Sequence, residues 1–178
     1  MKIRESNFND LLNIATLHTQ SWRENYADVL SANYLKEEAP AERTKVWTAR
    51  LSEPANNQMV LVAEVDGAFC GFICAFGAHH STYGTIIDNL HVKSNVKGQG
   101  LGSKLLVAAA KWASTNYGNS DLYLEVLACN TKAIGFYESL GAKKIDVSYW
   151  QTPCGNKAKE YIYSWGSPGQ LAQKAEKN

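Results

Sequence analysis

The chain lacks a strong charge imbalance, a targeting segment and any long apolar run. Its 18 lysines and arginines nearly balance 17 aspartates and glutamates, which leaves a formal net charge of +1. A protein that binds nucleic acid through a basic face needs a larger positive excess. Residues 1–10 contain no apolar stretch typical of a secretion signal, and no later run reaches membrane-spanning length. These absences favour a soluble, cytoplasmic protein with neither a nucleic-acid nor a membrane partner.

The four cysteines also lack the spacing of a metal or redox site. Cys70, Cys74, Cys129 and Cys154 form no C-x-x-C pair, and the first two share strand parity, as packing residues do. Neighbouring histidines at 79 and 80 would point to opposite faces of a strand, which is poor geometry for a shared metal. The sequence therefore predicts reduced cysteines and no metal site.

Length and composition favour one domain. With 178 residues, of which 45% are hydrophobic, the chain can bury one core but is short for two. No repeat, linker or low-complexity tract divides it. We expect a domain over residues 1–166, followed by a polar C-terminal tail over 167–178 that is a candidate for disorder.

Hydrophobic periodicity predicts an α/β (α+β) fold, a mixed sheet flanked by helices. The clearest hairpin signal joins two strands through the turn Asp66-Gly67. A helix that Asn9 or Asp10 can cap is expected to run through Tyr26. The expected strands are 2–4, 58–65, 69–78, 85–92, 121–127, 143–151 and 157–165, and the other expected helices are 31–36, 41–51, 100–117 and 131–140.

Glycine alternates with other residues at Gly98, Gly100 and Gly102, between an expected strand and a long amphipathic helix. Each glycine costs roughly 0.5–1 kcal/mol relative to alanine at a helix start, so three of them indicate a special requirement. Without Cβ atoms the loop can turn its N–H groups toward a ligand, and the helix N-terminus favours negative charge. The loop is therefore predicted to bind phosphate; an ordinary tight turn is the alternative.

Two common phosphate loops do not match this segment. The dinucleotide fingerprint G-x-G-x-x-G directly follows its strand, whereas here residues 93–97 intervene and the glycines alternate. The nucleoside-triphosphate loop ends in Gly-Lys-Ser/Thr, which is absent. A generic nucleotide-binding module is thereby disfavoured.

Residues 97–102 instead resemble the pyrophosphate loop of the GNAT superfamily of acyl-CoA-dependent N-acyltransferases, Arg/Gln-x-x-Gly-x-Gly/Ala, with lysine at the first position. Leu122-Tyr123-Leu124-Glu125-Val126 and the block from Asn130 to Ala142 resemble the strand and helix that follow this loop in the family. The resemblance covers about residues 60–163. It implies a mostly antiparallel twisted sheet and acetyl-CoA (coenzyme A) as cosubstrate.

The resemblance also implies where the cosubstrate binds. The pyrophosphate would be held by the loop, through Lys97, Gly98, Gln99, Gly100, Leu101, Gly102 and Ser103. The main-chain groups of Leu90, His91 and Val92 would pair with pantetheine where their strand splays from its neighbour, and one N–H would face the developing oxyanion. Asn130 would reach the pantetheine arm.

Acetyl transfer without a covalent enzyme intermediate needs a neutral amine and a proton for the departing thiolate. Tyr137 matches the position that the family uses as the acid, with a core tyrosine as the alternative. In several members a Glu on the strand before the loop acts as the general base, whereas this chain has Ile86 and Ile87 at the equivalent positions. Asp88 and His91 are the candidates for the base on that strand, although an ion pair and a half-buried packing role are the simpler explanations.

The acceptor is expected to be a primary amine of a small molecule, an amino acid or a peptide. Trp22 and Tyr26 are four residues apart on one helix face, so they are candidates for the acceptor wall or for a packing staple. His79 could also face the amine. The rival interpretation is a non-catalytic, acyl-CoA-binding regulatory domain of the same family. Aromatic residues of the last hairpin are compatible with a homodimer or with a filled core.

Overall fold

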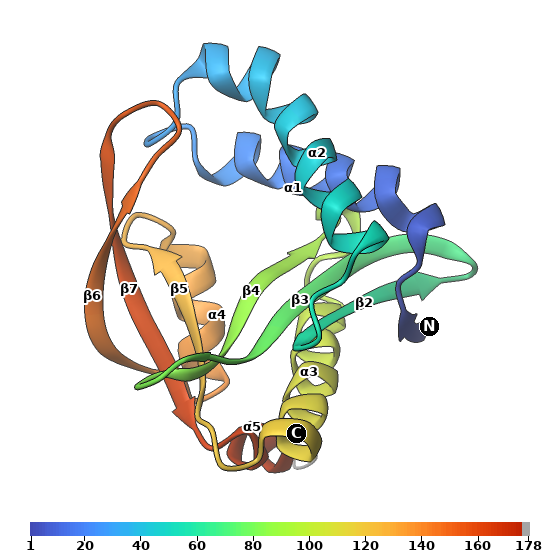
Figure 1. Ribbon diagram of the computed structural model, residues 1–178, viewed down its shortest axis with the longest axis vertical. Coiled ribbons are helices and arrows are strands. Elements are labelled where there is room, and N and C mark those ends of the chain that lie inside the picture. The colour runs from blue at the N-terminus through green and yellow to red at the C-terminus, as the bar shows by residue number, and fades with distance from the viewer. Residues whose placement is uncertain (176–178) are drawn as a thin grey trace.

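The computed structural model describes residues 1–175, which fold around one seven-stranded sheet (Figure 1). The strands follow the order β1-β2-β3-β4-β5-β7-β6. Every neighbouring pair is antiparallel except β4 and β5, which run parallel. The strands are β1 Lys2–Glu5, β2 Gln58–Val65, β3 Ala68–His80, β4 Gly84–Val92, β5 Leu122–Leu127, β6 Lys143–Gln151 and β7 Lys157–Gly166.

Helices cover both faces of the sheet (Figure 1). α1 and α2 pack on one face of β2 and β3, while α3, α4 and α5 lie on the other face. None of the described helices is long and apolar enough to cross a membrane. The helices are α1 Leu11–Asn25, α2 Ala39–Ser52, α3 Leu101–Tyr117, α4 Thr131–Ser139 and α5 Pro168–Ala175, with short turns η1 Phe8–Asp10, η2 Tyr34–Glu38 and η3 Ser94–Val96.

Strand alternation builds a separate core on each face of the sheet. On β3, Phe72 and Cys74 pack with α1 and α2, while Ile73 and Ala75 pack with α3. All four side chains are fully buried. Because successive side chains of a strand point to opposite faces, a strand covered on both sides reads as an almost continuous apolar run. The mixed, mostly antiparallel sheet flanked by helices confirms the predicted fold.

The start of the chain differs in detail from the sequence prediction. Asp10, one of the two predicted residues, is the N-cap residue of α1, but its side chain makes no capping bond to that helix. Asn7 caps the preceding turn η1, where its Oδ1 accepts from the N–H of Asn9 at 2.9 Å. The Asp10 carboxylate instead accepts from Arg4 at 2.8 and 2.9 Å. This ion pair lowers the pKa of Asp10. The same carboxylate accepts from the N–H of Asn7 at 2.9 Å and so completes a capping box, which means that Asp10 joins β1 to the start of η1.

The segment after Ser167 forms a helix in the structure, where the sequence predicts a polar tail that is a candidate for disorder. Leu171 of α5 is fully buried in the core that α3 forms with the sheet. The segment has one large apolar residue, Leu171, with Ala172 and Ala175 as its other hydrophobic residues, which gives a weak sequence signal for a helix. The last part of the predicted tail, residues 176–178, lies outside the described residues.

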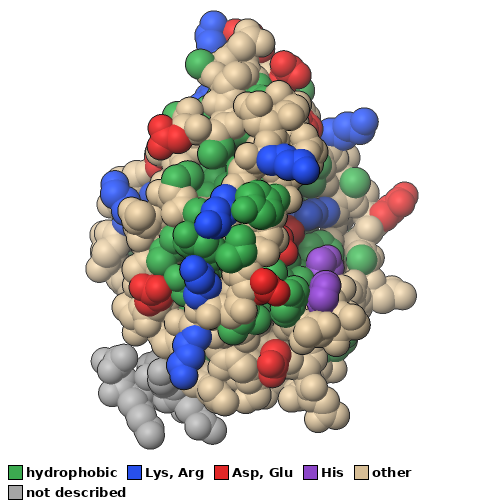
Figure 2. Space-filling view, turned by 90° about the vertical axis from the view of Figure 1, so that its left-hand side faces the viewer, with side chains coloured by type: hydrophobic (Ala, Val, Ile, Leu, Met, Phe, Trp, Pro, Cys, Tyr) green, Lys and Arg blue, Asp and Glu red, His purple; other side chains and the backbone are tan. Residues whose placement is uncertain are grey.

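The outer side of β6 and β7 mixes hydrophobic and basic side chains (Figure 2). Ile145, Val147 and Tyr149 of β6 are exposed. Nearby, Lys144 and Lys159 place their Nζ atoms 4.0 and 5.5 Å from the ring centroid of Tyr161. β6 is an edge strand, and such lysines interrupt the apolar surface that another strand would need for pairing.

Candidate active site

A cavity of about 520 Å³ opens where β4 and β5 diverge. The end of α1, the start of α3 and the first turns of α4 complete its walls. It is lined by Ser21, Asn25, Tyr26, Ile87, Asp88, Asn89, Leu90, His91, Val92, Val96, Lys97, Gly98, Gly100, Leu101, Gly102, Ser103, Glu125, Val126, Asn130, Lys132, Ala133, Phe136 and Tyr137.

The divergence of the two strands is abrupt. β4 pairs with β5 only through Thr85 with Leu122 and Ile86 with Tyr123. Beyond this point β4 continues beside β3, with Asp88 as the extra residue of a bulge between the pairs of Ile87 and Asn89. A bulge bends its strand. The predicted splay is thus present, and Leu90, His91 and Val92 keep one edge of their backbone open toward the cavity.

The glycine loop adopts a conformation that requires glycine. Gly98 and Gly100 have φ angles of +81° and +76°, in the left-handed region that residues with a Cβ rarely adopt. Among the bonds of residues 1–175, the N–H groups of Gly98, Gln99 and Gly100 donate to no protein atom. α3 begins at Leu101, so its first amides are unpaired as well. A cradle of free donors at a helix N-terminus suits a phosphate.

Lys97, at the first position of the loop, is held by α1. Its Nζ lies 3.6 Å from the Glu24 carboxylate, which also accepts from the hydroxyl of Ser94 at 2.9 and 3.0 Å. Lys97 remains half exposed beside the cavity. Gln99 belongs to the loop but does not line the cavity.

Gly100→Val is expected to weaken coenzyme A binding at least tenfold, because a β-branched side chain costs about 1–2 kcal/mol in the left-handed region and the loop would move to relieve it. Isothermal titration calorimetry with coenzyme A measures the change. Gly67→Val is the matched control, since Gly67 has a φ of +78° in the β2–β3 turn, away from the cavity. Equal weakening by both variants would contradict a specific role of the loop.

α4 contributes two predicted residues, and both line the cavity. Asn130 caps the helix: its Oδ1 accepts from the N–H of Ala133 at 3.2 Å, which leaves the amide NH₂ as a donor. Tyr137 packs its ring edge-on to Trp165, with centroids 6.0 Å apart. Its hydroxyl has no hydrogen-bond partner among the described residues, and burial raises its pKa to about 12. Tyr137 is therefore a protonated phenol at neutral pH.

Asp88 and His91 have structural partners. Asp88 accepts from Arg50 at 2.7 Å, and the same guanidinium donates to Asn89 at 3.0 Å. The Nδ1 of His91 lies 2.8 Å from the hydroxyl of Ser21, and its ring centroid is 4.8 Å from that of buried His18. Burial lowers the pKa of His91 to about 4, so its ring is neutral at pH 7 and a weak base. Both lie at the cavity, as the sequence predicts; their catalytic roles stay predictions.

Sequence reasoning missed Glu125, the second carboxylate that lines the cavity. It sits on β5 between Leu124 and Val126, which are buried in the α3 core on the opposite face. Burial of the carboxylate and repulsion from Asp88 raise the pKa of Glu125, although His79 acts in the opposite direction. The signal that could have revealed it is one charged residue inside an otherwise apolar strand.

The three residues predicted to contact the acceptor do not all line the cavity. Tyr26 lines the cavity, and burial raises the pKa of its hydroxyl. Trp22 stacks on Tyr26 with centroids 5.7 Å apart but packs into a buried cluster with Trp150, outside the cavity lining. His79 accepts from or donates to the hydroxyl of Tyr123 at 2.8 Å and also lies outside the lining.

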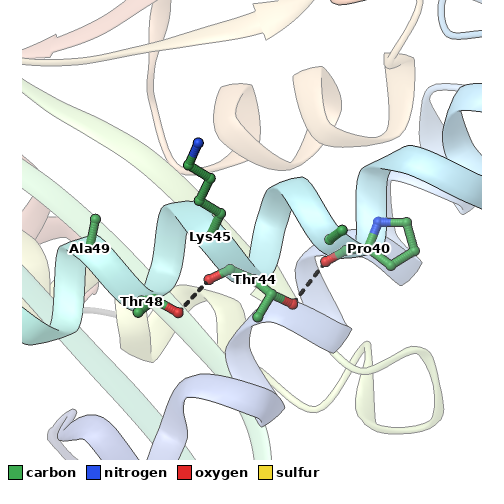
Figure 3. A pocket seen from close by; sticks show the side chains of 6 residues that line it. Pro40, Thr44, Lys45, Thr48 and Ala49 are labelled. Carbon is green, nitrogen blue, oxygen red and sulfur yellow. Dashed lines mark hydrogen bonds between the residues drawn. The ribbon is translucent and has the colours of Figure 1, made fainter.

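A second hollow lies along α2 and is lined by that helix alone (Figure 3). The hydroxyls of Thr44 and Thr48 donate to the carbonyls of Pro40 and Thr44 at 2.8 Å, so neither is available for chemistry. Within the described part of the chain, no group of three or more His, Cys, Asp or Glu side chains is placed to hold a metal ion. The reactive groups therefore gather in the cavity between β4 and β5.

An anion cradle, an open strand edge and titratable side chains around one cavity are typical of a group-transfer enzyme with a phosphate-bearing cosubstrate. A family model described as the acetyltransferase (GNAT) family matches residues 15–142, well over half of the chain. The chain therefore belongs to the GNAT family and is an acyl-CoA-dependent acetyltransferase. Members of this family use acetyl-CoA.

Curated relatives and solved structures agree with this assignment. The N-alpha-acetyltransferase of Sulfurisphaera tokodaii is 28% identical over 155 residues, 82% of each chain. A GCN5-related N-acetyltransferase from Rhodopseudomonas palustris has a TM-score of 0.73 at 22% identity, covering 93% of this chain and 94% of that one. The PaiA N-acetyltransferase of Thermoplasma acidophilum, solved in complex with coenzyme A, has a TM-score of 0.67 at 21% identity, covering 89% and 96%.

Proposed function

We propose that the protein transfers the acetyl group of acetyl-CoA directly to a primary amine of a small molecule, an amino acid or a peptide. The observation that carries this proposal is one continuous cavity that joins the loop amides to Glu125 and Tyr137. The name of the Sulfurisphaera tokodaii relative supports keeping peptide α-amines among the acceptors.

The cavity suits coenzyme A because its donors and cations lie at one end. The amides from Gly98 to Gly102 would hold the pyrophosphate, with Lys97 and Lys132 close by. The open edge of β4 at Leu90 and Val92 would pair with the amides of pantetheine. When bound, acetyl-CoA supplies the reactive thioester.

Two side chains would handle protons. An amine with a pKa of about 10.4 must lose a proton before it attacks, which costs about 4–5 kcal/mol at pH 7. Of the two carboxylates that line the cavity, Asp88 is paired with Arg50, whereas Glu125 forms no ion pair with a described residue. We therefore assign Glu125 as the base, acting directly or through one water. Tyr137 would donate its phenolic proton to the departing thiolate.

Tyr137→Phe is expected to lower kcat about 100-fold, because the variant lacks the phenolic proton but keeps the ring packing against Trp165. The raised pKa keeps the wild-type phenol protonated from about pH 6 to 9, so the loss should be the same throughout this range. Thiol release at saturating substrates measures it. A kcat equal to that of the wild type would remove Tyr137 from the mechanism.

The test of the function itself is thiol release from acetyl-CoA across a panel of amines, amino acids and peptides. Acceptor-dependent release with a matching acetylated product supports the proposal. Coenzyme A binding without turnover on any acceptor would favour the non-catalytic regulatory domain. The cytoplasmic location and the homodimer remain predictions; size-exclusion chromatography with light scattering tests the latter.

A further inference from the structure

A second carboxylate lies close to Glu125 on the same face of the sheet. In the β5–β7 register Glu125 is opposite Ile162, and Leu127 is opposite Glu160. Residues two apart on a strand share a face, so Glu160 is the diagonal neighbour of Glu125. Such Cα atoms are about 7–8 Å apart, within reach of two glutamate side chains. β7 contributes no residue to the cavity lining, so Glu160 stands behind Glu125 as seen from the cavity.

Glu160 forms no ion pair with a described lysine, arginine or histidine. Across β6 it faces Ser148, whose hydroxyl is buried and lacks a hydrogen-bond partner among the described residues. Asp146 is two residues away from Ser148 on β6 and accepts from the hydroxyl of Tyr83. From the end of α1, Tyr26 interacts with Glu160 electrostatically. The flanking Lys159 points to the opposite face, where its Nζ lies over the ring of Tyr161.

The remaining charged groups of this region surround Glu125 rather than Glu160. Asp88 approaches it from β4, and His79 and His80 approach it from the end of β3. Burial together with repulsion from Glu125 raises the pKa of Glu160 to about 7. Glu160 therefore exchanges its proton near neutral pH, beside the Glu125 carboxylate.

We propose that Glu160 is a positioning residue that acts through Glu125, by receiving the proton that Glu125 takes from the acceptor amine and passing it to solvent. This inference rests on the proposed function. Three transfers conserve the proton: it leaves the N–H bond of the acceptor ammonium and forms an O–H bond on Glu125, it leaves Glu125 and forms an O–H bond on Glu160, and it leaves Glu160 for water. No electrons are transferred. The orphaned Ser148 hydroxyl can donate to Glu160 when its carboxylate is ionised.

The proposal is tested by comparing wild type with Glu160→Gln as a function of pH. Glutamine copies the protonated glutamate, so the two proteins should turn over at similar rates near pH 5.5, where Glu160 is protonated. Near pH 8.5, where Glu160 is ionised, the variant should be slower by about tenfold. The ratio of the two rates cancels the titration of the acceptor. Glu160→Asp keeps a carboxylate and should restore part of the pH dependence.

Asp146→Asn is the matched control, because Asp146 lies on the same face of the sheet but hydrogen-bonds to Tyr83. Its rate relative to wild type should not change with pH. A ratio of wild type to Glu160→Gln that is constant from about pH 5.5 to 8.5 would overturn the proposal while leaving acetyl transfer intact. Absence of turnover in the wild type would overturn the proposed function and this inference with it.

A second readout needs no acceptor. In protein labelled with ¹³C at the glutamate carboxyls, one signal should titrate near pH 7 and disappear in Glu160→Gln. If all glutamate signals titrate below pH 5.5, Glu160 exchanges no proton near neutral pH and the proposal fails. Thermal unfolding of each variant separates these outcomes from loss of the fold.

Discussion

Glu125→Gln is expected to lower kcat/KM by about 10²–10⁴, a larger loss than we expect from any other single substitution in the cavity. Glutamine keeps the size and the polarity of the side chain but cannot accept the proton of the acceptor ammonium. Because the substitution leaves the glycine loop and the open edge of β4 unchanged, coenzyme A should bind as tightly as it does to wild type. Thiol release and calorimetry with coenzyme A measure the two quantities.

Asp88→Asn tests which of the two carboxylates that line the cavity, Asp88 or Glu125, acts as the base. Asp88 is committed to Arg50 at 2.7 Å, so its substitution should reduce turnover less than that of Glu125. A large loss in Asp88→Asn together with full activity in Glu125→Gln would make Asp88 the base, one of the two candidates that the sequence offers beside His91. An amine buffer at high concentration should not rescue either variant if the base must lie inside the cavity.

Trp47→Ala is expected to lower the free energy of unfolding by about 3–5 kcal/mol. Trp47 is fully buried on α2 and packs edge-on to Phe72 with centroids 5.1 Å apart. Its indole N–H donates to Nδ1 of His18 at 3.0 Å, so truncation also leaves a buried acceptor without a donor. Urea unfolding followed by circular dichroism measures the change.

Trp47→Phe separates the contribution of indole packing to stability from the contribution of the hydrogen bond. Phenylalanine keeps most of the packing against Phe72 but removes the hydrogen bond to His18, which should cost about 1–3 kcal/mol. The pKa of His18 is lowered by burial, so its ring is neutral and can accept this bond at pH 7. If both variants lost the same stability, packing of the indole would contribute nothing, contrary to the complete burial of Trp47.

The parts of the fold that local pattern determines could be predicted from the sequence. The Asp66-Gly67 hairpin is an example: both residues adopt positive φ angles, of 51° and 78°, as the two-residue turn requires. The last hairpin likewise pairs Lys143 with Ser164 and Gln151 with Lys157, across the expected turn. α5 could not be predicted, because its existence depends on a distant contact of Leu171 with the α3 core.

The amphipathic helix α3 shows what the spacing of hydrophobic residues can and cannot predict about burial. Leu101, Leu105 and Ala109 form an apolar stripe with a spacing of four residues and are buried. The stripe is turned slightly, however, so that Leu106 is fully buried while Trp112 is partly exposed and packs on Tyr117. A helix between a sheet and α5 is covered over a wider arc than one stripe, which the spacing of apolar residues alone does not reveal.

The glycine loop of the candidate site could be predicted from the sequence. The side chains that come together from several strands were harder to predict. Gly98 and Gly100 reveal the predicted phosphate-binding loop in the sequence, because positive φ angles favour glycine. Glu125 shows in the sequence only as one charge inside an apolar strand, and Glu160 gives no signal, because the proximity of the two follows from the β5–β7 register. Asp88 stands out in the sequence for its charge, but its ion pair with Arg50 depends on how α2 packs.

The short pairing between β4 and β5 has a consequence for solubility. A strand edge with unpaired amides and carbonyls normally invites another chain to add a strand, which leads to aggregation. Here that edge faces the cavity between β4 and β5 within the sheet, while α1 covers one face of β4 and α3 covers the other. The protein can therefore keep a row of hydrogen-bonding groups ready for a slender ligand without offering them to a second polypeptide.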